Sequence, residues 1–246
     1  MSDRVFLLVH GKGGGPNVPP DEENHIVELY EWLKGHGTVV YNEYPWGYTR
    51  RYNDTLEQGL QEVINDYNSL KAENKYVYTI GHSLGGNILI QLAQKGLTFP
   101  DGLILSNPAH NVGNPKFKNI VDWSVKKAKR LVEEGKGKET SDFVDILLSS
   151  IEVCYGTSES YLSFFDPDGM CNMYNYDASK MAHQHFLWIH SENDTTQMSF
   201  PRFWSGLFRN SGCVKSTSPT DYHGPDPTIH FPSIIEWYTK NEEQYE

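Results

Sequence analysis

Short, continuous runs of apolar residues recur along this chain at wide intervals. Four of them stand out, at residues 5–9, 76–80, 103–105 and 186–189. None alternates between apolar and polar positions, which is typical of strands covered on both faces, as in a parallel sheet between helices. Residues 39–41 predict a fifth strand, and the stretch around Val214 predicts a sixth.

Apolar residues at helical spacing lie between these runs. They predict helices around residues 26–33, 56–70, 88–93 and 234–238, with Asp54 as the N-cap of the second helix. The alternation of strands and helices predicts an α/β fold, with a doubly wound, mostly parallel sheet of about six strands flanked by helices. Sites in such sheets form beyond the carboxyl ends of the strands.

Residues 112–182 interrupt this alternation. About seventy residues without a strand of the core pattern predict a helical cap insertion, so the core comprises residues 1–111 and 183–246. Residues 116–138 carry eight Lys or Arg against three Asp or Glu. They are either a surface for an anionic substrate or membrane, or an amphipathic helix with a solvated basic face, which we favour. The aromatic residues that follow line a pocket or form the insertion's own core.

Composition narrows the function classes. The chain has 246 residues and a formal net charge of −11, which argues against nucleic-acid binding. Three widely spaced cysteines, without a C-x-x-C pair, suit a reducing compartment. The first apolar run is too short for a signal peptide or a membrane span. We therefore expect a cytoplasmic protein without stable membrane insertion, and neither a metal nor a cofactor; the oligomeric state is not predicted.

The segment Gly81-His82-Ser83-Leu84-Gly85 fits the pattern G-x-S-x-G, and it lies between a predicted strand and a predicted helix. A serine on such a tight turn projects its hydroxyl out of the sheet, and the small neighbours relieve the close backbone approach. The N-terminus of the following helix adds a positive dipole end. We predict Ser83 as a nucleophile. His82 is expected to pack in the turn rather than to act as a base.

A serine nucleophile needs a base, and the base needs an orienting acid. Asp194 follows the strand predicted at residues 186–189 and is our choice for the acid, although an N-cap role would also suit it. Glu192 is its nearest competitor. For the base we favour His223, in a Gly/Pro-rich loop before the last helix, over His230 at the start of that helix.

A tetrahedral intermediate also needs hydrogen-bond donors for its oxyanion. The backbone N–H of Leu84, directly after the nucleophile, is the first predicted donor. The second is expected in the glycine-rich loop after the first strand, at the N–H of Lys12, with Gly11 and Gly13 as alternatives. No Lys-Ser/Thr pair follows these glycines, which disfavours a phosphate-binding P-loop.

At these positions the chain resembles the α/β-hydrolase family. The matching residues are His10-Gly11, Gly81 to Gly86, Asp194 and His223, and the resemblance spans roughly residues 4–240 in the order of strands and helices. The usual N-terminal strands of that family are missing, because the first strand begins at Val5. The resemblance implies a Ser-His-Asp triad that acts through an acyl-enzyme, and an insertion that serves as a lid.

The expected function is therefore that of a serine hydrolase (an esterase, lipase or thioesterase) acting on a small-molecule carboxylic ester or thioester. The acyl chain, the leaving group and the choice between hydrolysis and acyl transfer stay open. The alternative is a ligand- or partner-binding protein that keeps the fold without turnover, since fold alone does not separate the two.

Overall fold

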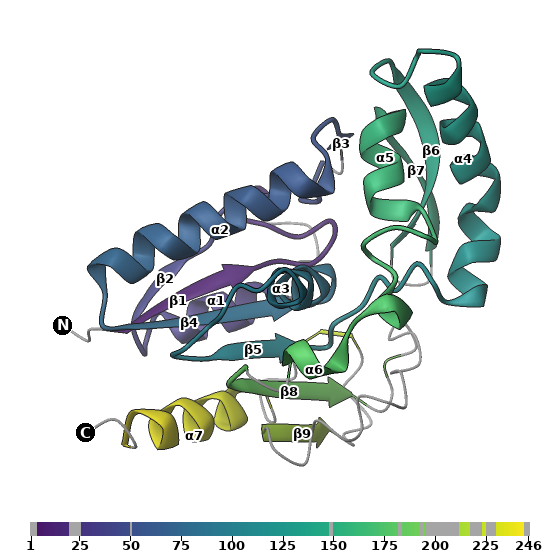
Figure 1. The fold of residues 1–246 in the computed structure, drawn as a ribbon. Helices are drawn as coiled ribbons and strands as arrows, with labels where there is room; N and C mark the ends of the chain where they lie inside the picture. The colour runs from purple at the N-terminus through teal and green to yellow at the C-terminus, as the bar shows by residue number, and fades with distance from the viewer. Residues whose placement is uncertain are drawn as a thin grey trace.

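Six parallel strands form one sheet in the computed structural model, which describes residues 4–19, 26–49, 51–147, 150–181, 184–191, 194, 212–216, 223–224 and 230–243. The strand order is β2-β1-β4-β5-β8-β9 (Figure 1). All six predicted strands are confirmed, with the bounds β1 Arg4–Val9, β2 Thr38–Val40, β4 Tyr76–His82, β5 Leu103–Ser106, β8 Phe186–Ser191 and β9 Gly212–Ser216. Every pairing in this sheet is parallel.

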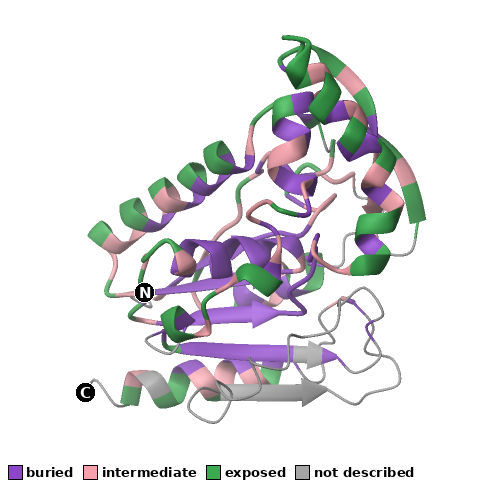
Figure 2. Cartoon of the chain, turned by 45° about the vertical axis from the view of Figure 1, so that its right-hand side comes forward, coloured by how far each residue is buried: buried purple, intermediate pink, exposed green. Residues whose placement is uncertain are grey.

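Helices cover both faces of the sheet, which explains why its strands are apolar without alternation. Phe6 and Leu8 pack with apolar residues of α1 (Val27–Leu33) and α7 (His230–Glu243). Their neighbours Leu7 and Val9 point to the opposite side, where they pack with α2 (Leu56–Glu73) and α3 (Leu84–Gln94). The strands β1, β4 and β5 and the helix α3 are buried, while the outer surfaces of α2 and of the elements at the upper right are exposed (Figure 2). The fold class is thus the predicted α/β class.

The N-cap of α2 differs from the prediction. Thr55, and not Asp54, caps the helix: the Thr55 hydroxyl accepts a hydrogen bond from the Gln58 N–H, and the Gln58 side chain accepts one from the Thr55 N–H. Thr55 has the extended backbone that an N-cap requires, and a glutamine three residues later completes this reciprocal pair. The prediction failed because an acidic residue next to a threonine offers two plausible caps.

The insertion lies beyond the carboxyl ends of the strands, to the right in Figure 1. We call its elements the cap: α4 (Pro115–Glu133), β6 (Thr140–Leu147), β7 (Ser150–Thr157) and α5 (Ser158–Phe165). A 3₁₀ turn (Met173–Asn175) and α6 (Ala178–Met181) return the chain to the core. The short strand β3 (Arg51–Tyr52), which comes from the core, pairs in parallel with β7. The cap therefore contains a three-stranded sheet in the order β3-β7-β6.

The expectation of a helical cap is wrong for residues 140–157, because they form the antiparallel hairpin β6–β7. Phe143 and Asp145 are buried, whereas Thr140 and Asp142 on the other face of β6 are exposed. This alternation has the period of a strand and not of a helix. The sequence does not show this alternation as an apolar pattern, because a charged residue, Asp145, occupies one of the buried positions.

The cap and the core share one hydrophobic cluster. The ring of Tyr52 lies 4.9 Å from that of Phe164 and 5.4 Å from that of Phe165, and Trp46 lies 6.3 Å from Phe164. Several basic side chains of α4 form ion pairs, as Lys127 does with Asp142. Among the described residues, no helix has both the length and the apolar character needed to cross a membrane.

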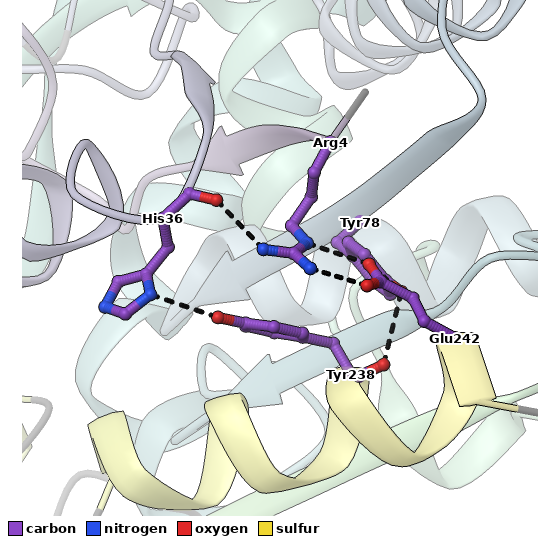
Figure 3. A network of polar contacts seen from close by, with 5 residues as sticks. All are labelled: Arg4, His36, Tyr78, Tyr238 and Glu242. Atoms are coloured by element: carbon purple, nitrogen blue, oxygen red, sulfur yellow. Dashed lines mark hydrogen bonds and ion pairs between the residues drawn. The ribbon is translucent and has the colours of Figure 1, made fainter. Parts of the chain in front are cut away.

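A polar network closes the opposite end of the sheet, where the strands begin (Figure 3). Arg4 donates two hydrogen bonds to the Glu242 carboxylate, from Nε at 2.8 Å and from Nη2 at 2.5 Å, and a third to the carbonyl of His36. The Tyr78 hydroxyl donates to Glu242 Oε1 at 3.0 Å. Tyr238 lies under the Arg4 guanidinium at 4.4 Å, and its hydroxyl is 3.1 Å from His36 Nδ1. This network ties α7 to β1 and β4.

Candidate active site

Ser83 occupies the sharp turn between β4 and α3. Its backbone has φ 54° and ψ −122°, a strained conformation for a residue with a side chain. Although Ser83 is the N-cap residue of α3, its hydroxyl makes no capping hydrogen bond. A Cβ on Gly85 would lie 2.1 Å from the Val9 carbonyl oxygen, so the turn can approach β1 only with glycine there. The strain and the missing cap leave the Ser83 hydroxyl directed away from the helix.

The Ser83 hydroxyl meets His223, which lies 140 residues later in the chain. His223 Nε2 is 2.7 Å from Ser83 Oγ, and His223 Nδ1 is 2.7 Å from Asp194 Oδ2. Because a carboxylate only accepts, Nδ1 carries the proton and Nε2 is left to accept the one from Ser83. The Asp194 side chain is fully buried, whereas Ser83 is half-buried. The structure thus brings together all three residues that the sequence singled out for this chemistry.

The alternative candidates are placed differently. His230 begins α7, is fully buried, and has its Nδ1 3.1 Å from Ser106 Oγ. It is His223, therefore, that meets the serine. Glu192, the competitor of Asp194, lies outside the described residues.

The backbone of His223 is held by two side chains that sequence reasoning did not assign to the site. Its carbonyl accepts hydrogen bonds from His82 Nε2 at 2.8 Å and from Asn107 Nδ2 at 3.0 Å. The Asn107 Oδ1 accepts from the N–H of Ser191, at the end of β8. Asn107 thus links the backbone of His223 to the strand that precedes Asp194. Its position directly after β5, at the carboxyl edge of the sheet, is the signal that could have identified it.

The glycine-rich loop after β1 lies against the nucleophile. A Cβ on Gly11 would lie 2.7 Å from the Ser83 Cβ, so only glycine permits this approach. Gly13 donates its N–H to the Trp46 carbonyl at 2.9 Å, which removes it as an alternative oxyanion donor. Within the described part of the chain, the N–H groups of Lys12 and Leu84 donate to no other protein group. Both therefore stay available to a ligand.

His10 fixes the start of this loop. Its Nδ1 donates to the Gly11 carbonyl at 2.8 Å, and its Nε2 accepts from the Tyr44 N–H at 3.2 Å. The Trp46 indole donates to the His10 carbonyl at 2.8 Å. Burial lowers the pKa of His10 to about 4, against the opposing effect of the Gly11 carbonyl. His10 is therefore neutral near pH 7, with the tautomer that holds the loop.

A second buried histidine, His110, lies in the loop between β5 and α4. Its Nε2 donates to the Phe164 carbonyl of α5 at 3.0 Å, and its ring packs against Phe117 and Phe165. Burial, followed by the positive charge of Lys12, lowers the pKa of His110 to about 3. Its backbone is left-handed, with φ 66°. His110 is thus a neutral contact between the core and the cap.

Comparison with known proteins relates this chain to hydrolases. A family model described as serine aminopeptidase, S33, matches residues 26–149. A proline iminopeptidase of Saccharolobus solfataricus is 26% identical over 138 residues, which cover 54% of this chain and 39% of the relative. The matched segment therefore spans about two fifths of that relative.

Solved structures cover nearly the whole chain. A monoacylglycerol lipase of Paleococcus ferrophilus superposes with a TM-score of 0.63 at 19% identity, and the match covers 96% of this chain and 94% of that one. Est1E of Butyrivibrio proteoclasticus, with ferulic acid bound, gives a TM-score of 0.57 at 16% identity, with 99% and 90% covered. At such low identity these neighbours support the fold alone.

Proposed function

Because this chain belongs to the serine aminopeptidase S33 family of α/β hydrolases, we propose that it is a serine hydrolase that cleaves a carboxylic ester or thioester through an acyl-enzyme on Ser83. The observation that carries the proposal is the continuous line of hydrogen bonds from Ser83 through His223 to Asp194. It lies at the carboxyl edge of the sheet, where α/β proteins bind their substrates.

Each residue has a defined part in the proposed reaction. His223 Nε2 takes the Ser83 proton as Ser83 Oγ attacks the acyl carbonyl, and the leaving alcohol or thiol then receives that proton. Asp194 keeps the imidazole oriented and stabilises its cationic form. Water then attacks the acyl-enzyme, with His223 as the base, and the acid product leaves. The N–H groups of Leu84 and Lys12 donate to the oxyanion that forms in both steps.

The α3 helix and the clamp on His223 support this assignment. The eleven residues of α3 point their N-terminus at Ser83, where a positive dipole end favours a developing negative charge. The hydrogen bonds from His82 and Asn107 to the His223 carbonyl fix the backbone of the base. Preorganised groups of this kind lower the barrier because they need not move during the reaction.

A second candidate function is peptide-bond hydrolysis. The description of the matching family and the iminopeptidase relative favour it. We propose esters first, taking our lead from the names of the two structural neighbours described above, a monoacylglycerol lipase and Est1E with bound ferulic acid, although their likeness itself shows only the fold. A third candidate is a binding protein without turnover. Binding alone does not explain why a serine, a histidine and an aspartate are joined by hydrogen bonds.

Two measurements test the proposal. A fluorophosphonate probe should label the wild-type protein and leave Ser83→Ala unlabelled, with circular dichroism as the control for folding. Rates on p-nitrophenyl esters of increasing acyl length, on thioesters and on aminoacyl p-nitroanilides then rank the substrates. A folded wild-type protein that resists the probe and turns over none of them would refute the proposal. A preference for the anilides would replace ester by peptide hydrolysis.

A further inference from the structure

We propose that Asp145 of the cap is a positioning residue for the oxyanion site, because it holds the side chain of Lys12 and so fixes the Lys12 backbone N–H beside Ser83. The inference rests on the proposed function, since it concerns the donor assigned there to the oxyanion. It adds a role for the cap in the chemical step itself.

The contact is an ion pair between the core and the cap. Lys12 Nζ donates to Asp145 Oδ1 and to the carbonyl of the next residue, Ile146. The Lys12 side chain is 6% exposed and that of Asp145 is 0% exposed. Lys12 lies in the loop after β1 and Asp145 lies on β6, 133 residues later. No water shell surrounds such a pair, so it is screened far less than a surface ion pair.

Asp145 is built into its place by further donors. Its Oδ1 accepts from the N–H of Ile146 at 2.6 Å, and its Oδ2 accepts from the hydroxyl of Tyr52 at 3.2 Å. Tyr52 belongs to β3, the strand that the core contributes to the cap sheet. The carboxylate thus receives donors from the Lys12 loop, from β3 and from its own strand. A buried carboxylate with several donors keeps one orientation.

The Lys12 loop needs such an anchor. Lys12 stands between Gly11 and Gly13-Gly14-Gly15, and glycine leaves the backbone more conformational freedom than any other residue. Gly13 is tied by its N–H to Trp46, and Gly11 is pressed against Ser83. The peptide N–H of Lys12 has no such tie within the described chain. Its side chain supplies one, since moving the ammonium away from Asp145 would leave the buried carboxylate without its counter-charge.

An oxyanion donor is effective only where it already points at the developing charge, about 2.7–3.1 Å from the oxygen. Loosening the Lys12 side chain should therefore weaken the transition state more than the ground state. Loss of a donor typically costs about 10²–10³ in kcat, and a donor that is only loosened should cost less. We expect a fall of about tenfold to a hundredfold in kcat, with KM changed by about twofold or less.

The test compares Asp145→Asn with a control on the same strand. Asp142→Asn removes an ion pair with Lys127 in which the Asp142 side chain is 61% exposed, and it should leave kcat unchanged. Asp145→Asn should lower kcat and, by the same factor, the affinity for a trifluoromethyl ketone, which forms an oxyanion on reaction with the serine. A merely structural role would lower the fraction of active protein, which active-site titration measures, and would leave both constants of the titrated enzyme intact.

Asp145→Asn leaves a buried ammonium without its counter-charge, so a second variant keeps the inference testable if that protein does not fold. Lys12→Met with Asp145→Asn removes both charges, yet it retains the Lys12 peptide N–H. This double variant should also lose about tenfold or more in kcat, and no more than the single variant if the two residues act as one unit. Wild-type kcat and ketone affinity in either folded variant would overturn the inference. Wild-type protein that is neither labelled nor active would instead refute the proposed function itself.

Discussion

The two ends of the parallel sheet use polar side chains in opposite ways. At the carboxyl end, Ser83 is half-buried on a strained turn, and Nε2 of His223 accepts a hydrogen bond from its hydroxyl. At the amino end, the Arg4 guanidinium and the Glu242 carboxylate engage each other and their neighbours (Figure 3). Both networks join segments that lie far apart in the chain. The first is open to a substrate and the second is closed on itself, so the first should govern turnover and the second stability.

The largest effect that tests this contrast is expected at His223. His223→Ala should lower turnover about 10⁴-fold or more, because Ser83 loses its base. His230→Ala is the matched control, since His230 is buried near the same edge and contacts Ser106. Its turnover per folded molecule should stay close to wild type, while its melting temperature falls. Equal loss of ester hydrolysis in both variants would contradict the assignment of the base.

A smaller effect on turnover is expected at Asn107, which holds the carbonyl of His223. Asn107→Gly removes the amide but tolerates the positive φ of 44° at this position. We expect kcat to fall by up to about 10²-fold, because a small displacement of a catalytic group is costly. The steady-state rate and the rate of fluorophosphonate labelling should fall together. A variant with wild-type rates would show that the His82 contact alone holds the His223 carbonyl.

At the amino end, Glu242→Gln should change stability without changing turnover. A partly exposed ion pair is worth about 1 kcal/mol or less, which for a chain of this size is a fall of about 2–4 °C or less in melting temperature. Glu236→Gln is the control, since Glu236 pairs with Lys240 at an exposed site on the same helix. Differential scanning calorimetry and ester hydrolysis separate the two quantities. A loss of turnover in titrated Glu242→Gln would break the contrast.

The last contrast concerns stability in acid, where the two ends of the sheet should lose their contributions in different pH windows. His10 and His110 are neutral in the folded protein, with pKa values lowered by burial to about 4 and about 3. Their unfolded forms bind protons below about pH 6.5, so stability falls as the pH drops from there towards 3. The pKa of Glu242 is lowered, because hydrogen bonding and charge from Arg4 outweigh its desolvation. That contribution is lost only at lower pH, below the usual range of a glutamate.

His110→Asn isolates the first of these windows. Asparagine accepts the left-handed backbone of this position and does not titrate. The melting temperature of this variant should fall less steeply between pH 6.5 and pH 4 than that of the wild type, whatever its value at pH 7. An unchanged slope would show that His110 is not a source of the acid lability.

The sequence predicted the sheet and the turn at Ser83 because short stretches of neighbouring residues determine both. Runs such as Val5–Val9 are apolar throughout, and the glycines at 81 and 85 mark a turn where a Cβ would meet backbone within 2.6 Å and 2.1 Å. The order of serine, aspartate and histidine added the rest, through a resemblance to known hydrolases. Hydrogen bonds then separated His223 from His230, which sequence position alone left open.

What the sequence did not predict depends on partners distant in the chain. Asn107 follows a strand like many loop residues, and only the fold brings it to His223. Asp145 looks like a solvated charge in an alternating strand until Lys12 is placed against it. The hairpin β6–β7 was not predicted for the same reason, since the buried carboxylate of Asp145 interrupts the apolar pattern on the buried face of β6. Each of these three errors concerns residues whose neighbours come from another segment, whereas the error at the N-cap of α2 was local.

The short strand β3 has a consequence for exchanging parts between related enzymes. Arg51 and Tyr52 come from the core, yet they pair in register with Tyr155 and Gly156 of β7. A Cβ on Gly156 would lie 2.2 Å from the Tyr52 carbonyl oxygen, so the fit between the two strands is tight. A chimaera cut only at residues 112 and 182 would give the transplanted hairpin a foreign neighbour on that edge. The segment around residues 51–52 must therefore be transplanted together with the hairpin.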